Sequence, residues 1–254
     1  MQSSLRIKTC FRNGITEIED AFYTSPYKVM HPFHDGKHSD IMMMAASAGL
    51  FGGDHFSLNL EFDKNSDARF LSQSYEKIFD SNGKKTLKNV NMIVNENAHV
   101  EYKPYPAIPF ANSDFENTTE VHLAKSATFS FIDIFSCGRT GMGEAFQMNC
   151  YRSRAKFYVE DKLVFADHTW IDPKRFDYRQ IGFWQGYTHN GMLFFYTPDA
   201  NHESALQEKI REFAKEFQGS IGVSALSQGI LVRALSMRGE TIWNFFEKLN
   251  LRQI

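Results

Sequence analysis

Gly49-Leu50-Phe51-Gly52-Gly53-Asp54 separates an apolar run, Ile41 to Ala46, from the alternating segment Ser57-Leu58-Asn59-Leu60-Glu61-Phe62. Three glycines among five residues predict a tight turn, because glycine adopts backbone angles that a Cβ atom disfavours. We expect one strand to lead into this corner and another to leave it. Asp54 closes the corner, which fixes its carboxylate in space. This arrangement suits a fixed acidic site, and it equally suits an ordinary turn.

Alternation of apolar and polar residues dominates the chain from Leu5 to about Ile171. It is clear in four segments: Ile15–Asp20, Ala68–Ser72, Asn89–Val94 and Thr128–Ile134. Alternation with period two predicts β-strands, and the polar clusters between the segments predict turns. Many short strands joined by turns favour a mainly β fold with a large antiparallel β-rich body, either sandwich-like or coiled. No repeat of fixed length is visible, so the sequence does not predict a regular solenoid.

The C-terminal part has a different pattern, which divides the chain into a β-rich body, residues 1–191, and a small α+β part, residues 192–254. The elements expected in the second part are a strand at Met192–Thr197, a helix from Asn201 or His202 to about Phe217, strands at Ile221–Val223 and Gly229–Leu235, and a helix from Glu240 to about Leu251. We expect this part to pack on the body as one unit. The aromatic-rich connection, residues 173–191, is expected to be packed or to face a partner.

The composition excludes several classes of protein. Hydrophobic residues make up 43% and aromatic residues 15% of the 254 residues, which is enough for a sizeable core. A net charge of −2 gives no electrostatic footprint for nucleic acid. No apolar run is long enough for a membrane-spanning helix, and the N-terminus lacks the apolar core of a signal peptide. Three scattered cysteines, Cys10, Cys137 and Cys150, fit reduced thiols, so we expect a cytoplasmic protein.

The chain carries no recognised catalytic signature, so we do not expect an enzyme. It lacks a nucleophile elbow, a phosphate-binding loop with its lysine, and a His-Glu-x-x-His helix. The glycine-rich stretch Gly138–Glu144 lacks the lysine of a nucleotide site. We interpret it as a wide turn that is braced by an ion pair between Arg139 and Glu144.

Two carboxylates occur in apolar strand surroundings, where a charge is costly unless it is paired, hydrogen-bonded or next to a wet cavity. Asp133 has apolar neighbours on both sides, and Asp167 occurs late in a long strand. Period two places Asp133 on the same face as Phe131 and Phe135. Its side chain therefore points either into a wet interior or outward to solvent, together with both phenylalanines. The same two alternatives hold for Asp167.

Two further segments each have a functional and a structural interpretation. Ser72-Gln73-Ser74-Tyr75-Glu76-Lys77 either lines a groove with its hydroxyls and Lys77 or forms a polar strand end. Pro104–Phe110 contains three prolines, which gives a stiff, extended backbone. This segment is either a docking surface that loses little entropy on binding or a guard for a sheet edge.

Together these pieces resemble the urease accessory protein family called UreD, or UreH in some bacteria, and look closest to the UreH branch. The resemblance covers nearly the whole chain. It rests on the order and spacing of the motifs from Ser25 to Glu144, because none of them is specific alone. The motifs are Ser25-Pro26-Tyr27-Lys28 with His31-Pro32-Phe33, the corner Gly49–Asp54, Ser72-Gln73-Ser74 with Lys77, Pro106–Phe110, and Gly138-Arg139 with Gly143-Glu144.

The resemblance implies a non-catalytic assembly factor for urease. Such proteins bind apo-urease and a helical partner, UreF, and through UreF they recruit the GTPase UreG, which carries nickel. The resemblance also implies that the complex passes nickel through an internal passage lined by polar and acidic groups. The resemblance implies no tightly bound cofactor, because nickel is only in transit, and it allows a dimer within the complex.

On this resemblance Asp54 is the first acidic candidate for the nickel path, because it belongs to the matched corner. Asp133 and Asp167 are further candidates because of their apolar settings. Carboxylates, hydroxyls and waters bind nickel weakly, as a conduit requires, whereas a cage of His and Cys ligands would trap it. The supporting or partner-facing candidates are Ser72, Ser74, Lys77, Pro109, Phe110, Arg139 and Glu144.

The residues alone leave two other functions open. A β-sandwich module that binds a sugar or peptide would use Phe183-Trp184-Gln185-Gly186-Tyr187 as an aromatic platform. A metalloenzyme would use the histidine-rich stretch near residue 35, whose side chains are otherwise solvated loop residues. The possible ligands for nickel or zinc are His31, His34, Asp35 and His38.

Overall fold

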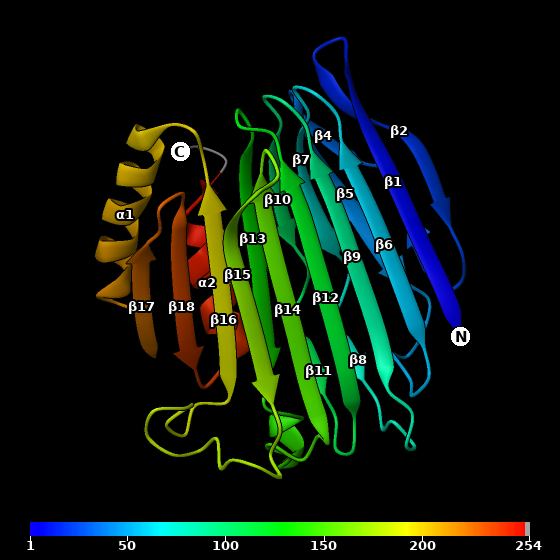
Figure 1. The fold of residues 1–254 in the computed structure, drawn as a ribbon, viewed down its shortest axis with the longest axis vertical. Coiled ribbons are helices and arrows are strands. Elements are labelled where there is room, and N and C mark those ends of the chain that lie inside the picture. The colour runs from blue at the N-terminus through cyan, green and yellow to red at the C-terminus, as the bar shows by residue number, and fades with distance from the viewer. Residues whose placement is uncertain (252–254) are drawn as a thin grey trace.

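The computed structural model describes residues 1–251 and contains two β-sheets that face each other, with two helices beside one of them (Figure 1). The mainly β class predicted from the sequence is confirmed. The first sheet has seven strands in the order β15-β14-β12-β9-β6-β1-β2. Its strands are β1 Gln2–Arg12, β2 Ile15–Tyr23, β6 His55–Phe62, β9 Thr86–Val94, β12 Asp114–Leu123, β14 Cys150–Val159 and β15 Lys162–Ile171.

The second sheet has eleven strands. Its main path has the order β17-β18-β16-β13-β10-β7-β5-β3, and β4, β8 and β11 pair beside this path. Its strands are β3 Tyr27–Val29, β4 Phe33–Asp35, β5 His38–Ala45, β7 Asp67–Ser72, β8 Glu76–Ile78, β10 His99–Lys103, β11 Ala107–Pro109, β13 Thr128–Ser136, β16 His189–Tyr196, β17 Ser220–Ala225 and β18 Ile230–Ser236.

The chain passes back and forth between the two sheets, so most neighbouring strands of the body pair in parallel. The antiparallel pairing expected from the sequence is therefore wrong for these strands. The strands β1, β6, β9, β12 and β14 pair in parallel, and so do β5, β7, β10 and β13. Antiparallel pairs flank these runs, for example β1 with β2 and β14 with β15. The reason is that the turns Asp63–Ser66, Asn95–Ala98 and Ala124–Ala127 cross to the opposite sheet instead of reversing within one. Alternation assigns a residue to a face but does not choose the neighbouring strand.

Equivalent positions of successive coils stack on one another between the sheets. Phe70, Tyr102 and Phe131 occupy matching register positions of β7, β10 and β13. Their rings are nearly parallel, with centroids 5.6 and 5.4 Å apart. Such rows of buried apolar side chains stabilise the fold, because the hydrophobic effect grows with the apolar area removed from water.

The C-terminal part extends the second sheet and carries the two predicted helices. The strands β16, β18 and β17 continue the sheet beyond β13, while α1 Ala200–Ala214 and α2 Gly239–Lys248 pack on its outer face. Ile132 and Ile134 of β13 belong to this outer core, so β13 is buried on both faces. Residues 252–254, which end the C-terminal part predicted from the sequence, lie outside the residues that the structure describes. None of the helices within residues 1–251 is long and apolar enough to cross a membrane.

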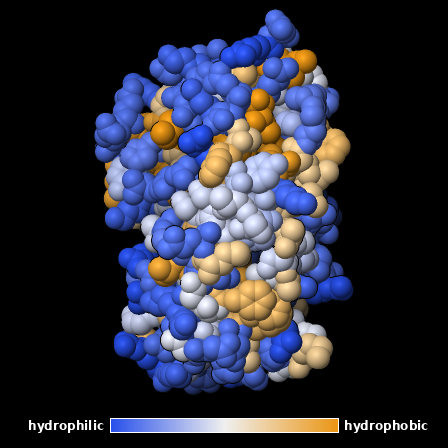
Figure 2. Space-filling model, turned by 90° about the vertical axis from the view of Figure 1, so that its right-hand side faces the viewer, coloured by the Kyte–Doolittle hydropathy of each residue, from blue (hydrophilic) through white to orange (hydrophobic). Residues whose placement is uncertain are grey.

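The edge of the fold near β1 and β2 exposes apolar side chains among polar ones (Figure 2). The exposed aromatic residues of this region include Phe22 and Tyr23 of β2 and Phe33 of β4. Large exposed apolar side chains that lie near one another often mark a surface for a protein partner.

The corner Gly49–Asp54 joins β5 to β6 as the predicted tight turn. Gly53 has a φ angle of +85°, in the region that favours glycine. The Leu50 N–H donates to the carbonyl oxygen of Lys77, and the Phe79 N–H donates to the carbonyl oxygen of Leu50, both at 2.8 Å. The corner therefore holds the segment around β8 in place.

Gly52→Ala is expected to destabilise the fold, because a Cβ atom at this position would lie 1.8 Å from the carbonyl oxygen of Ser81. Forcing these backbones apart should lower the free energy of unfolding by about 2–3 kcal/mol. Gly141→Ala is the matched control, since nothing lies within 4 Å of the added methyl group. Urea denaturation measures both variants, and equal stabilities would contradict the close packing of the corner.

Candidate functional site: a charged cavity between the sheets

A cavity of about 360 Å³ lies between the sheets beside the glycine corner. Its mouth is formed by exposed or half-buried residues of the loop Ser47–Gly49 and of Gln73–Lys77, which leads into β8. Its deeper wall is formed by buried side chains of both sheets, among them Lys88, Tyr102, Phe115, Thr119, Phe131 and Tyr151. The cavity therefore leads from surface loops into the interior of the β body.

Lys88 brings a positive charge into this interior. On β9 it shares the inward face with Val90 and Met92, and it is only 7% exposed. Its ammonium group donates to Oε1 of Glu76 at 2.6 Å. Burial by itself lowers the pKa of Lys88, but the attraction of the Glu76 carboxylate outweighs burial, so the net shift of this pKa is upward. Lys88 is therefore charged inside the protein.

Asp133 faces the same cavity from β13, with Phe131 on the same inward face. Its Oδ2 accepts a hydrogen bond from Ser153 Oγ at 3.3 Å, and Ser153 Oγ accepts one from Asn117 Nδ2 at 3.3 Å. Burial raises the pKa of Asp133 to about 6, while the positive charge of Lys88 acts in the opposite direction. The structure thus excludes the outward, solvated alternative for Asp133.

Uncharged oxygen atoms complete the wall of the cavity. Tyr27 and Tyr102 line it, and burial raises the pKa of both phenols, that of Tyr102 to about 12, so both stay neutral. Oδ1 of Asn117 is buried and has no hydrogen-bond partner among the described residues. Together with the carboxylates of Glu76 and Asp133, these oxygens are ligand atoms that divalent cations accept.

Asp167 faces the space between the sheets from β15, on the same inward face as Phe165. Its Oδ2 accepts a hydrogen bond from Thr169 Oγ1 at 3.2 Å, and its Oδ1 pairs with Arg233 of β18. Thr169 and Arg233 line a second cavity of about 480 Å³ at this edge. The negative charge of Asp167 also contributes to the raised pKa of Asp133. Asp133 therefore lines the first cavity, whereas Asp167 pairs with a residue that lines the second.

A row of polar side chains crosses the first sheet between the two cavities. Lys88, Asn117, Ser153 and Thr169 occupy matching register positions of β9, β12, β14 and β15. The first two line the first cavity, and Thr169 lines the second. This polar row shares its inward face with the apolar row formed by Met92 and its register neighbours.

Asp54 holds the corner together and does not line the cavity. Its Oδ2 accepts the backbone N–H of Phe51 at 2.9 Å, and its Oδ1 lies 2.8 Å from the α-amino nitrogen of Met1. Its corner neighbours Gly49 and Leu50 line the cavity instead. The structure thus does not bring the carboxylate of Asp54 together with that of Asp133.

The supporting candidates from one segment gather at the mouth of the cavity. They are Ser72, Ser74 and Lys77. Ser72 is buried, and its Oγ accepts the backbone N–H of Tyr105 at 2.8 Å. Lys77 is exposed at the mouth. Of the two alternatives for this segment, the one in which it lines a groove agrees with these positions.

The remaining supporting candidates form a separate cluster outside the cavity. Arg139 and Glu144 make the ion pair that the sequence predicted, with Arg139 Nε donating to Glu144 Oε2 at 2.8 Å. The guanidinium carbon of Arg139 lies 4.3 Å from the ring centroid of Phe110, which follows Pro109. These contacts brace the turn after β13.

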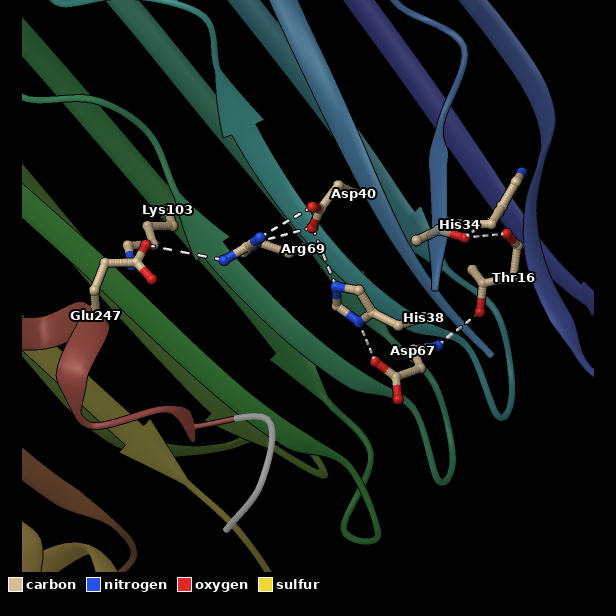
Figure 3. A network of polar contacts seen from close by, with 9 residues as sticks. Thr16, His34, His38, Asp40, Asp67, Arg69, Lys103 and Glu247 are labelled. Carbon is tan, nitrogen blue, oxygen red and sulfur yellow. Dashed lines mark hydrogen bonds and ion pairs between the residues drawn. The ribbon is translucent and has the colours of Figure 1, made fainter. Parts of the chain in front are cut away.

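The histidine-rich stretch does not converge on a metal site. His38 lies between two carboxylates, with Nδ1 2.5 Å from Oδ1 of Asp67 and Nε2 3.1 Å from Oδ1 of Asp40 (Figure 3). His34 instead contacts Ser39 Oγ at 2.8 Å. Within residues 1–251, no group of three or more His, Cys, Asp or Glu side chains is arranged to hold a metal ion. The metalloenzyme hypothesis therefore has no ligand set in this region.

Lys88 and Glu76 are the site residues that the sequence analysis missed as a pair. The sequence signal for Lys88 is its position two residues before Val90 and four before Met92, because this spacing places all three on the same face of a strand. A charged residue at such a position requires a partner. No local pattern identifies Glu76 as that partner.

Comparison with known proteins reveals similarity to urease accessory proteins along the chain. The family model "UreD urease accessory protein" matches residues 1–253. The urease accessory protein UreH of Helicobacter hepaticus is 34% identical over 252 residues, which cover 98% of each chain. UreD of Acetivibrio thermocellus is 31% identical over 204 residues, covering 80% of this chain and 78% of that protein. UreD of Flavobacterium johnsoniae is 27% identical over 254 residues, covering 98% and 91%.

Asp133→Asn is expected to stabilise the protein at neutral pH. Because the folded state raises the pKa of Asp133 from 3.8 to about 6, its favourable contribution is complete below pH 3.8 and is lost as the pH rises through 6. The gain in unfolding free energy from Asn should therefore be small near pH 4 and reach about 3 kcal/mol above pH 7. Thermal unfolding from pH 4 to pH 8 measures this gain.

The control for this pH series is Asp161→Asn, because the Asp161 side chain is 98% exposed. This variant should match the wild type at every pH. A gain for Asp133→Asn that does not change with pH would contradict the raised pKa.

Proposed function

Because the chain belongs to the UreD family of urease accessory proteins, we propose that it is a non-catalytic scaffold that helps to deliver nickel to apo-urease. The observation that carries this proposal is the polar row between the first cavity and the second, more open one, in which Ser153 donates to Asp133 and Thr169 donates to Asp167. In this proposal nickel is the cargo of the protein and not a resident cofactor.

The chemistry of the interior suits a cation that must leave again. Its ligand atoms are oxygens of carboxylates, hydroxyls, phenols and an amide. Ni²⁺ binds more tightly to imidazole and thiolate ligands, and no cluster of these faces the cavity within the described residues. Single carboxylates such as Asp133 and Asp167 therefore attract the ion without enclosing it.

The partners in this proposal are a UreF-like helical protein, a UreG-like GTPase and apo-urease. The names of the relatives, which are accessory proteins of urease, support an assembly role. Exposed aromatic side chains of β2 and β4 provide apolar surface for such contacts. The connection before β16 adds further exposed residues, Phe176 and Ile181.

The alternative of a sugar- or peptide-binding module has less support. Trp184, the centre of the proposed aromatic platform, is only 4% exposed. It packs edge-on against Phe135 and Phe146, with centroids 5.3 and 5.1 Å apart. Because the central ring of the platform packs into the core instead of lying open on the surface, the scaffold function is favoured.

Asp133→Asn tests the nickel path in the assembled complex. The substitution is internal, so the variant should still co-purify with its partners and apo-urease. Removing the charge that attracts the cation should lower the nickel content and activity of urease several-fold. Asp161→Asn should activate urease like the wild type. Normal nickel loading by Asp133→Asn in an intact complex would refute the path through this cavity.

Asp54→Ala distinguishes the two interpretations of the glycine corner. Loss of the bond from the Phe51 N–H should lower the free energy of unfolding by about 1–2 kcal/mol. The folded fraction should then still deliver nickel, because Asp54 does not line the cavity. Intact complexes that fail only in nickel transfer would instead assign Asp54 to the path.

A further inference from the structure

We propose that Lys88 is a built-in competitor of the transported cation: its ammonium group occupies the carboxylate of Glu76 in the cavity, so that a divalent ion is not retained there. The inference rests on the proposed function and concerns how the same cavity releases its cargo.

The ammonium group of Lys88 acts on two carboxylates that come from the opposite sheet. It extends from β9 of the first sheet and contacts Glu76 of β8 at 2.6 Å. It also acts through space on Asp133 of β13, whose ionised form it favours. Both carboxylates line the cavity, and Lys88 contacts that of Glu76 directly.

Packing does not require a charge at this position. The inward neighbours of Lys88 on β9, Val90 and Met92, are apolar and fully buried. Replacement of a buried ion pair by apolar side chains is often neutral or stabilising. The charge of Lys88 therefore has an electrostatic role in the cavity and is not a means of filling space.

The balance of charges explains this role. Glu76 and Asp133 carry two negative charges, and Lys88 reduces their sum to one, while the exposed Lys77 adds a positive charge at the mouth. Without Lys88, the carboxylates of Glu76 and Asp133 and the unpartnered Asn117 Oδ1 would line the cavity with no ammonium group on Glu76, and oxygens of this kind attract divalent cations. With Lys88, an entering ion meets a like charge and must displace the ammonium from Glu76.

The lysine side chain is suited to such an exchange. Its ammonium is a compact charge on a flexible four-carbon stem, so it can leave Glu76 and return. Return of the ammonium to Glu76 then favours departure of the ion. Lys88 thus keeps the cavity attractive to cations but prevents tight retention.

The test measures Ni²⁺ binding to the full chain by equilibrium dialysis. Lys88→Leu, which introduces no metal-binding atom, should bind Ni²⁺ at least about tenfold more tightly than the wild type. The matched control combines Lys88→Leu with Glu76→Gln, which removes one charge of each sign and should restore weak binding. Equal affinities of Lys88→Leu and the wild type would overturn the inference.

A second measurement covers the case that Lys88→Leu folds poorly. A ligand that binds the folded state raises Tm, so Ni²⁺ should raise the Tm of Lys88→Leu more than that of the wild type. Lys88→Arg keeps the positive charge and should show only the wild-type rise. A rise for Lys88→Arg as large as that for Lys88→Leu would also overturn the inference.

Activation of urease separates this inference from the proposed function. We expect Lys88→Leu to keep Ni²⁺ in the scaffold and to lower the nickel content of urease. If Asp133→Asn leaves activation unchanged, the passage itself is wrong. If Asp133→Asn blocks activation while Lys88→Leu neither retains nickel nor slows its delivery, only the competitor role of Lys88 is wrong.

Discussion

Parallel hydrogen bonding between successive coils is the constraint on which the rest of this structure depends. Because β6, β9 and β12 pair in register, side chains of equal parity form rows that face the interior together. Met92 thus lies between Leu60 and Val121 in one such row, and the rings of the opposite sheet stack in the same manner. Because of this register, the alternation of apolar and polar residues within each strand produces continuous rows of side chains across the interior.

The same register also aligns the polar side chains that form the polar row. Lys88, Asn117, Ser153 and Thr169 are far apart in the chain, yet the ladder places them side by side. Burying a lysine and a carboxylate between apolar sheets costs stability, which an apolar row would avoid. In the proposed function, this cost is offset because the buried charges guide a cation.

The C-terminal helix braces the mouth of the cavity from outside the second sheet. Trp243 of α2 stacks on Tyr105 with centroids 4.6 Å apart, and the Tyr75 hydroxyl donates to Glu240 at 3.1 Å. Both tyrosines line the cavity. Glu247 of α2 pairs with Lys103 and also lies near Arg69 (Figure 3). Arg69 in turn makes two hydrogen bonds with Asp40. The contacts of α2 therefore hold the mouth in a defined shape.

The sequence by itself determined the strands, the glycine corner, the two C-terminal helices and the face shared by Asp133 and Phe131, because these depend on local periodicity and turn chemistry. The order of its motifs also indicated the family. Only the tertiary structure decided strand direction, the pairing of Lys88 with Glu76, and the use of Asp54 within its own turn. These features depend on contacts between different coils or on the direction of one side chain, and no local pattern of residues encodes which strand becomes the neighbour of another.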